Sequence, residues 1–129
     1  MHKKLGIIVP YRNRFDQLQE FKREIKKYLS RKKIPFEIYV IQQDDAKLFN
    51  RGMLLNIGYT YAKKDNCDYV VFHDVDMIPF RVDYSYNEIP IHLATRFKNV
   101  DRFMFEEYFG GVTLFPIDVF EKINGFSNK

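Results

Sequence analysis

The sequence predicts an α/β fold in which a mostly parallel central sheet is flanked by helices. Three short runs of β-branched and aromatic residues alternate with two segments of helical periodicity, and polar residues follow each run. Strands that alternate with helices in this way form parallel sheets through right-handed crossovers. With 129 residues and no linker or internal repeat, the chain is expected to form a single domain over residues 1–129.

The first predicted strand covers residues 5–9, a β-branched run closed by Pro10 and typical of a buried parallel strand. A helix is expected next, with Asn13 or Asp16 as its cap and Pro35 at its end. Apolar residues at helical spacing give this helix one inward face. The members of that face are Phe15, Leu18, Phe21, Ile25 and Leu29.

The alternation continues with two more strands and one helix. Strands are predicted at residues 36–41 and 69–72, with a helix over residues 50–64 between them. The inward face of that helix is predicted to consist of Leu54, Ile57, Tyr61 and Ala62. Beyond residue 79 the pattern is less regular. The elements predicted there are strands at residues 91–94 and 112–115 and a short helix over residues 116–123.

Polar residues follow each of the three predicted parallel strands. Arg12 and Arg14 follow the first strand, residues 43–45 the second and residues 74–76 the third. In open parallel sheets, ligands bind beyond the carboxyl ends of the strands, which lie at one edge. We therefore expect these segments to share one rim and to form a ligand site there.

The residue types at this rim suit a metal ion and a phosphate. Asp74 and Asp76 flank one residue, and carboxylate oxygens select hard cations such as Mg²⁺ or Mn²⁺. Such an ion bridging a diphosphate would offset the charge on a departing nucleotide. Arg12 and Arg14 lie where a helix begins, and guanidinium groups together with free helix N–H groups bind phosphate. The alternatives are solvated carboxylates and surface arginines that pair with Asp16 or Glu20.

Two further segments place aromatic residues where they would contact a ligand. Phe49 precedes Asn50 and Arg51, so its ring could stack on a base while the arginine reaches a phosphate. The alternative is a core phenylalanine beside an exposed arginine. In residues 108–111 two aromatic residues precede two glycines, and glycine lets the backbone approach a ligand closely. The alternative there is a tight turn with core aromatic residues.

Charge and cysteine usage narrow the expected partners and compartment. The net charge of +4 suits an anionic ligand. The basic run at residues 22–33 is expected to be the solvated back of the first helix, with a nucleic-acid or polyanion surface as the alternative. His73 and His92 are expected to have structural roles. Cys67 is the only cysteine, and no apolar run reaches the length of a membrane span, so we expect a cytoplasmic protein.

Taken in order, the motifs resemble the β-1,4-galactosyltransferase family. The matching segments cover nearly the whole chain, and their order is more specific than any single match. Residues 29–34 with residues 38–40, and the histidine before Asp74, look most like the xylosylprotein galactosyltransferase branch of that family. The matching segments are residues 7–14, 49–58, 73–79, 108–112 and 123–128.

The resemblance implies a GT-A fold, dependence on Mn²⁺, a UDP-galactose-type donor and a carbohydrate acceptor. It implies that galactose, or a related hexose or N-acetylhexosamine, is transferred with inversion after a carboxylate deprotonates the acceptor hydroxyl. It also implies that Asp76 is a direct metal ligand supported by Asp74, and that Tyr108 and Gly111 face the donor sugar. The residues implied to hold uridine and diphosphate are Pro10, Tyr11, Arg12, Asn13, Arg14, Phe49, Asn50, Arg51, Val75 and Asp76.

The sequence also departs from the family pattern. Family members continue after the match at residues 123–128 into a Trp-Gly-Trp-Gly-Gly-Glu-Asp stretch and a metal-binding His, whereas this sequence contains no Trp. We therefore expect a truncated, donor-binding part of the fold, with the catalytic base unassigned and with self-association through uncovered apolar surface. The alternative is a nucleotide-sugar or metal-binding module without transfer activity. The absence of a membrane anchor and of disulfides typical of animal members fits the expected cytoplasmic location.

Overall fold

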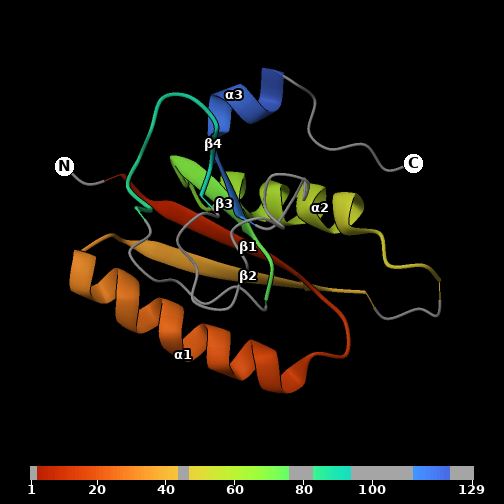
Figure 1. Ribbon diagram of the computed structural model, residues 1–129. Helices are drawn as coiled ribbons and strands as arrows, with labels where there is room; N and C mark the ends of the chain where they lie inside the picture. Colours follow the sequence, from red (N-terminus) through yellow and green to blue (C-terminus); the bar gives the residue numbers. More distant parts are fainter. Residues whose placement is uncertain (1–2, 44–46, 76–82, 94–111, 123–129) are drawn as a thin grey trace.

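The computed structural model describes residues 3–43, 47–75, 83–93 and 112–122, and for Arg51 and His92 it describes the backbone (Figure 1). The alternation of strands and helices predicted up to residue 73 is confirmed, as are the later strand and short helix after residue 111. No helix in this part of the chain is long and apolar enough to cross a membrane. The elements are β1 (Leu5–Tyr11), α1 (Phe15–Lys32), β2 (Phe36–Gln42), α2 (Arg51–Lys64), β3 (Tyr69–His73), β4 (Ile91–His92), β5 (Val112–Pro116) and α3 (Ile117–Lys122).

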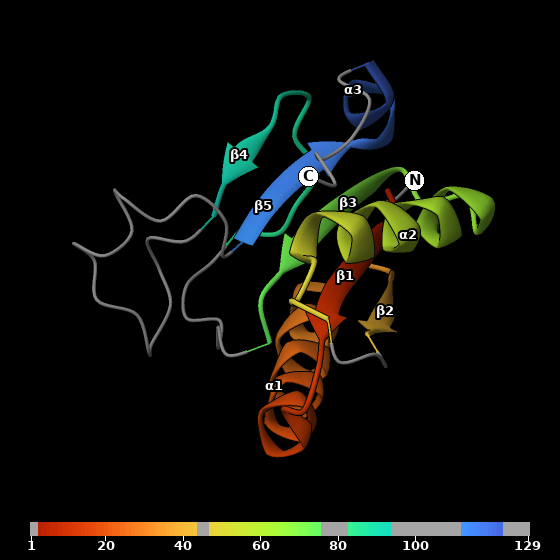
Figure 2. The ribbon, with the colours of Figure 1, turned by 90° about the vertical axis from the view of Figure 1, so that its right-hand side faces the viewer.

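The strands form one sheet in the order β2-β1-β3-β5-β4, which Figure 2 shows across the molecule. β1 lies parallel to both β2 and β3, so the predicted parallel arrangement is confirmed for this half. β5 runs antiparallel to β3 and to β4. The sheet is therefore mixed, and the three strands whose carboxyl ends were expected to share a rim are adjacent.

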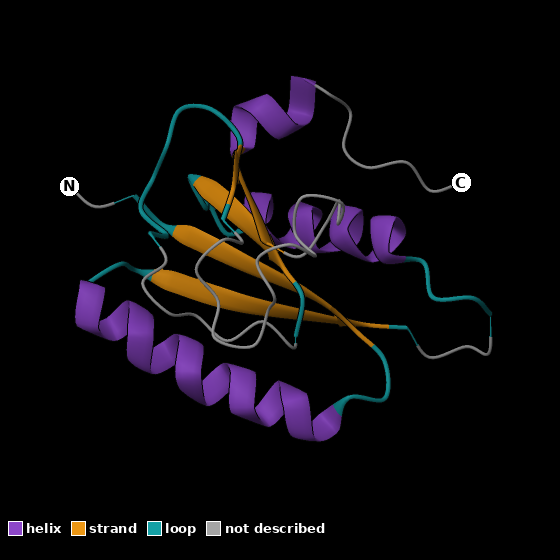
Figure 3. Cartoon of the chain, in the orientation of Figure 1, coloured by secondary structure: helices purple, strands orange, loops and turns teal. Residues whose placement is uncertain are grey.

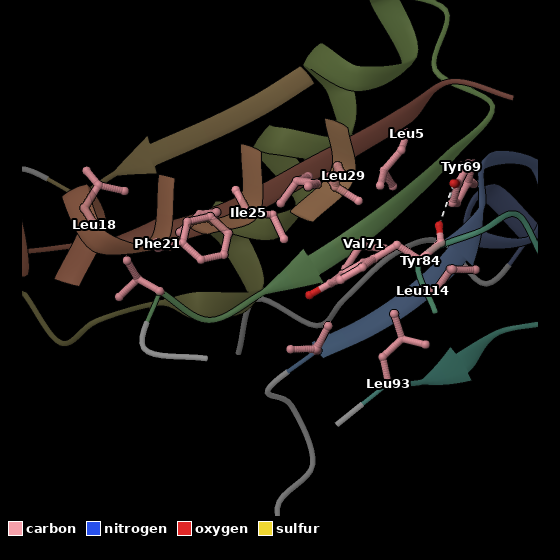
Figure 4. Close-up of a cluster of buried hydrophobic side chains, with 14 of the residues drawn as sticks. Leu5, Leu18, Phe21, Ile25, Leu29, Tyr69, Val71, Tyr84, Leu93 and Leu114 are labelled. Carbon is pink, nitrogen blue, oxygen red and sulfur yellow. Dashed lines mark hydrogen bonds between the residues drawn. The ribbon is translucent and has the colours of Figure 1, made fainter. Parts of the chain in front are cut away.

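One face of the sheet is covered by α1 and the other by α2 and α3 (Figure 3). On the α1 face, the buried residues of the helix pack against strand residues such as Leu5 and Val71, as Figure 4 shows. Because both faces are covered, β1 and β3 are buried at every position rather than at every second one. The buried residues of α1 are Leu18, Phe21, Ile25 and Leu29, as predicted.

The start of α1 differs from its prediction. Phe15 is exposed because it occupies the first helical position, beyond the end of the strands beneath the helix. Neither Asn13 nor Asp16 caps the helix, since Arg14 is the N-cap residue and makes no side-chain capping bond. Asn13 instead adopts a left-handed backbone conformation with φ of 54°, which asparagine tolerates better than most residues. The lysines and arginines from Arg23 onward lie on the exposed side of the helix.

The inward face of α2 also differs from its prediction. Leu54, Leu55 and Ala62 are buried, whereas Ile57 and Tyr61 are exposed and line an open hollow beside β2. β2 is the edge strand of the described sheet, so side chains that project past it have no strand beneath them. Helical periodicity identifies the apolar side of a helix, but it does not say where the sheet below it ends.

Candidate functional site

The carboxyl ends of β1, β2 and β3 meet at one edge of the sheet. The register pairs Tyr11 with Gln42 and Ile8 with Phe72, so the residues that follow each strand lie along the same rim. Arg12, Gln43 and Asp74 are therefore neighbours of adjacent strand ends, as the alternation of elements predicted. Asp45, which was expected on this rim, lies outside the described residues.

One side of this rim, which we call the basic corner, is formed by Arg12, Gln43, Lys47, Phe49 and Asn50. Arg12 Nη1 donates a hydrogen bond to the Lys47 carbonyl oxygen at 2.5 Å. The same guanidinium lies 5.5 Å from the centre of the Phe49 ring, within the range of a cation–π contact. Arg12 thus joins the segment after β1 to the segment after β2. An aromatic ring and a cation are the groups predicted to bind a base and a phosphate, respectively.

Gln43 holds the basic corner together. Its side chain is buried, and its amide nitrogen donates to the carbonyl oxygens of Lys47 at 3.3 Å and Leu48 at 3.0 Å. Its amide oxygen accepts from the Asn50 backbone N–H at 2.8 Å. Asn50 in turn caps α2, because its side-chain oxygen accepts from the Met53 N–H at 3.0 Å. The predicted binding residue Asn50 therefore has a structural task in forming the helix start.

The other predicted residues near this corner differ in exposure. Pro10 and Tyr11 are buried as the last residues of β1. Asn13 and Arg14 are exposed at the start of α1, and the backbone of Arg51 begins α2. Three residues in the segments after β1 and β2 also have exposed apolar side chains. They are Phe15, Leu48 and Phe49.

The opposite side of the rim, which we call the acidic corner, is formed by His73, Asp74, Val75 and Tyr84. His73 Nδ1 lies 2.8 Å from the Asp74 carbonyl oxygen, and Nε2 lies 2.8 Å from the Tyr84 hydroxyl. Burial, with a smaller contribution from Tyr28, raises the pKa of the Tyr84 phenol well above its ordinary value. The hydroxyl therefore stays protonated and can donate to the histidine ring. The prediction that His73 has a structural role fits its complete burial.

Asp74 supplies a carboxylate at the end of β3, where it is half-buried. Its oxygens are donors of the type that Mn²⁺ and Mg²⁺ select, so the residue fits the expected hard cation. His73 does not add a metal ligand, because both of its ring nitrogens are already engaged within the core. Among the described residues, at this rim or away from it, no group of three or more His, Cys, Asp or Glu side chains could hold a metal ion.

Three of the predicted site residues, Asp76, Tyr108 and Gly111, lie outside the described residues, so their roles stay predictions. Two residues that organise the site were not predicted to do so: Gln43 was expected on the rim without a binding role, and Tyr84 was not expected there. Gln43 stands immediately after a predicted strand, and that position was a usable signal. Tyr84 lies in an irregular segment, and no local pattern marked it as the partner of His73.

Two models of known protein families match this chain. The N-terminal region of glycosyl transferase group 7 matches residues 1–87, and the N-terminal domain of galactosyltransferase matches residues 92–129. The chain belongs to glycosyltransferase group 7. This result confirms the family resemblance drawn from the ordered motifs.

The curated relatives include β-1,4-galactosyltransferases and a xylosylprotein galactosyltransferase, the branch named in the prediction. Pig β-1,4-galactosyltransferase 5 is 40% identical over 132 residues, which cover 97% of this chain and 33% of the relative. The xylosylprotein 4-β-galactosyltransferase of Caenorhabditis elegans is 33% identical over 131 residues, covering 99% of this chain and 45% of the relative. The chain thus spans less than half the length of these relatives.

A solved structure in the same family supports the fold. A mutant of Drosophila β-1,4-galactosyltransferase 7, in complex with manganese, UDP-Gal and xylobiose, aligns with a TM-score of 0.84 and 32% sequence identity. The alignment covers 98% of this chain and 54% of that chain. The expected GT-A fold is therefore confirmed for the part of the fold that this chain spans.

Proposed function

We propose that this chain is the donor-binding part of a Mn²⁺-dependent galactosyltransferase that takes galactose from UDP-galactose. The observation that carries the proposal is the meeting of the basic and acidic corners at one edge of a sheet. The same fold is seen in a relative solved with manganese, UDP-Gal and xylobiose. The base of a nucleoside diphosphate can stack on an aromatic ring. Its phosphate oxygens can bind arginine side chains and a metal ion.

The basic corner suits the uridine and diphosphate of such a donor. The partly exposed Phe49 ring provides an aromatic face, and Arg12 beside it provides a planar cation for phosphate oxygens. Arg14 is exposed at the start of α1, where backbone N–H groups have no side-chain cap. Anionic groups bind well at such helix starts. We include Arg51 and the buried Pro10 and Tyr11 in the proposed site because they adjoin Asn50 and Arg12 in the chain.

The acidic corner suits the metal ion. Asp74 and Asp76 would hold Mn²⁺ through carboxylate oxygens, and Val75 between them would lie beside the nucleotide. When bound, Mn²⁺ would supply positive charge for the leaving UDP. Tyr108 and Gly111 are proposed to face the donor sugar. The reaction would proceed with inversion: the acceptor oxygen forms the new bond to the anomeric carbon as the bond to UDP breaks, and a carboxylate base takes the hydroxyl proton.

Calorimetric titration of UDP with and without Mn²⁺ tests this proposal. We expect UDP to bind in a Mn²⁺-dependent manner and Asp76→Ala to abolish the Mn²⁺ dependence. Asp118→Ala is the matched control, because Asp118 is an exposed carboxylate of α3. This helix follows the β5 residue that pairs with the start of β3, so Asp118 lies at the edge of the sheet opposite the rim. Absence of UDP binding under every condition, or equal losses in both variants, would refute a donor site at this rim.

Transfer is tested separately from binding. Release of UDP from UDP-galactose would be measured with Mn²⁺ and with xylobiose, the sugar bound in the Drosophila relative, as the test acceptor. Acceptor-dependent release that disappears in Asp76→Ala supports the transferase. Mn²⁺-dependent UDP binding without release would instead identify a nucleotide-sugar-binding module.

A further inference from the structure

His73 is the fully buried polar group of the acidic corner. It ends β3, its ring lies 4.7 Å from that of Phe21 in α1, and it stacks against Tyr84 at 5.9 Å between ring centroids. A histidine in such a position needs partners for both ring nitrogens, because burying an unpaired polar atom is costly. The Asp74 carbonyl and the Tyr84 hydroxyl supply those partners at 2.8 Å each.

The chemistry of these partners fixes the proton on the ring. A carbonyl oxygen only accepts hydrogen bonds, so His73 Nδ1 must carry the proton that it shares with the Asp74 carbonyl. In the neutral ring Nε2 then accepts, and the Tyr84 hydroxyl donates to it. The carbonyl of the Asp74–Val75 peptide is thereby turned toward the ring. Because C=O and N–H point in opposite directions in a trans peptide, the Val75 N–H is directed away from His73.

Tyr84 is itself held at several points. Its carbonyl oxygen accepts from the Tyr69 hydroxyl at 2.6 Å, as the dashed line in Figure 4 shows. Its ring meets Tyr28 edge-on at 5.9 Å between centroids. The bond between His73 and Tyr84 therefore ties the end of β3 to the point where the described chain resumes after residue 82.

We propose that His73 and Tyr84 are positioning residues that set the orientation of the Asp74–Val75 peptide for metal binding at the end of β3. This inference rests on the proposed function, since a metal ligand must be held in a defined direction before the ion arrives. His73 acts here as a hydrogen-bond donor to the backbone and not as a ligand. The two nitrogens have separate tasks: Nδ1 orients the turn, and Nε2 anchors the ring to Tyr84.

Two substitutions separate these tasks. In His73→Asn the side-chain NH₂ stands near the place of Nδ1 and can still donate to the Asp74 carbonyl. In His73→Gln the amide reaches toward Tyr84 instead. We expect His73→Gln to weaken Mn²⁺ binding by about 10-fold or more, the usual loss when a supporting residue is changed, and His73→Asn to weaken it by less than about threefold. Free Mn²⁺ would be followed by electron paramagnetic resonance in the presence of UDP.

Thermal unfolding of both variants supplies the control. A residue that serves only the core would lower the melting temperature and leave Mn²⁺ affinity equal in the two variants. Equal affinities would therefore overturn the inference while leaving the proposed function intact. If the unaltered chain binds no Mn²⁺ with UDP, the proposed function fails and the inference fails with it.

A measurement on the unaltered protein does not depend on the variants folding. Long-range ¹H–¹⁵N spectra distinguish the two neutral tautomers of histidine. We expect His73 to be protonated at Nδ1, and in Tyr84→Phe we expect the Nε2 resonance to shift because its donor is gone. A ring protonated at Nε2 would show that His73 does not donate to the Asp74 carbonyl and would overturn the inference.

Discussion

The basic and acidic corners lie on the same rim but are built from different parts of the molecule. In the acidic corner His73 and Tyr84 have exposed fractions of 0% and 1%, and both pack against aromatic residues of the core. In the basic corner Phe49 is 40% exposed and Leu48 is 92% exposed. Its organising contacts are hydrogen bonds from side chains to the backbone of one loop.

This difference matches what each corner is proposed to hold. A metal ion requires oxygen atoms in defined directions, so its ligands gain from attachment to a rigid core. A nucleobase that stacks on an aromatic ring tolerates small movements, and an arginine on the surface can follow a phosphate group. Changes in the acidic corner should therefore reduce folding stability as well as binding. Changes in the basic corner should mainly reduce binding.

The largest expected effect on the free energy of unfolding comes from Tyr84→Phe. It removes the hydroxyl that donates to His73 Nε2 inside the core and keeps the ring. Loss of one partner of a buried hydrogen bond costs about 1–3 kcal/mol. Urea unfolding would measure the loss, with Tyr61→Phe as the control because Tyr61 is an exposed tyrosine of α2. Equal stability of the two variants would mean that the acidic corner is not fixed by this bond.

A smaller effect is expected from Asn50→Ala in the basic corner. The substitution removes the side-chain oxygen that caps α2 at Met53, and a lost N-cap costs about 1 kcal/mol. Asn50→Ser restores a capping oxygen and should recover most of that stability in the same urea assay. If both variants also lose UDP affinity to the same extent, Asn50 contacts the donor in addition to capping the helix. Unchanged stability in Asn50→Ala would argue against the cap.

The sequence predicted the parallel half of the fold well for a physical reason. Buried strands and amphipathic helices have distinct periods, and runs such as residues 69–72 are too short and too β-branched for a helix. Strand direction after residue 111 was not predictable from these patterns, because it depends on how the chain returns to the sheet. The exposure of Ile57 and Tyr61 was missed since the sheet ends at β2.

The site was predicted in outline but not in its supporting contacts. The rule that parallel strands end at one edge placed Arg12 and Asp74 after neighbouring parallel strands, and β1 and β3 are such neighbours. The rule carries no information about which residues support them, and Tyr84 contacts His73 although the two lie eleven positions apart in the sequence. Asn50 was selected as a binding residue, and its side chain proved to be a helix cap. Such contacts depend on tertiary packing, which residue spacing does not encode.

A still smaller effect is expected at the exposed margin of the acidic corner, and it depends on pH. The Ser85 hydroxyl and backbone N–H donate to Asp83, and these bonds lower the pKa of that carboxyl. A lowered folded-state pKa stabilises the protein above the ordinary aspartate value of about 3.9, and this contribution is lost as the pH falls through the lowered pKa. Ser85→Ala should cost about 0.5 kcal/mol or less at pH 7, because water screens an exposed site.

The measurement for Ser85→Ala is urea unfolding at a series of pH values. The difference from the unaltered chain should shrink below about pH 4 and vanish once Asp83 is protonated in both states. Ser30→Ala, which changes an exposed serine of α1, is the control for the loss of a hydroxyl. A difference that does not change with pH would show that Ser85 acts independently of the Asp83 charge.

The smallest effect on folding, and the sharpest contrast with Tyr84→Phe, is expected from Phe49→Leu. The side chain is partly exposed, so the free energy of unfolding should change by about 0.5 kcal/mol or less. Loss of the aromatic face should nevertheless lower UDP affinity by about 5- to 10-fold, because one aromatic stacking contact contributes about 1 kcal/mol. Calorimetry with Ile89→Ala as the exposed apolar control measures this loss. A large drop in stability with unchanged affinity would mean that the basic corner, like the acidic one, belongs to the core.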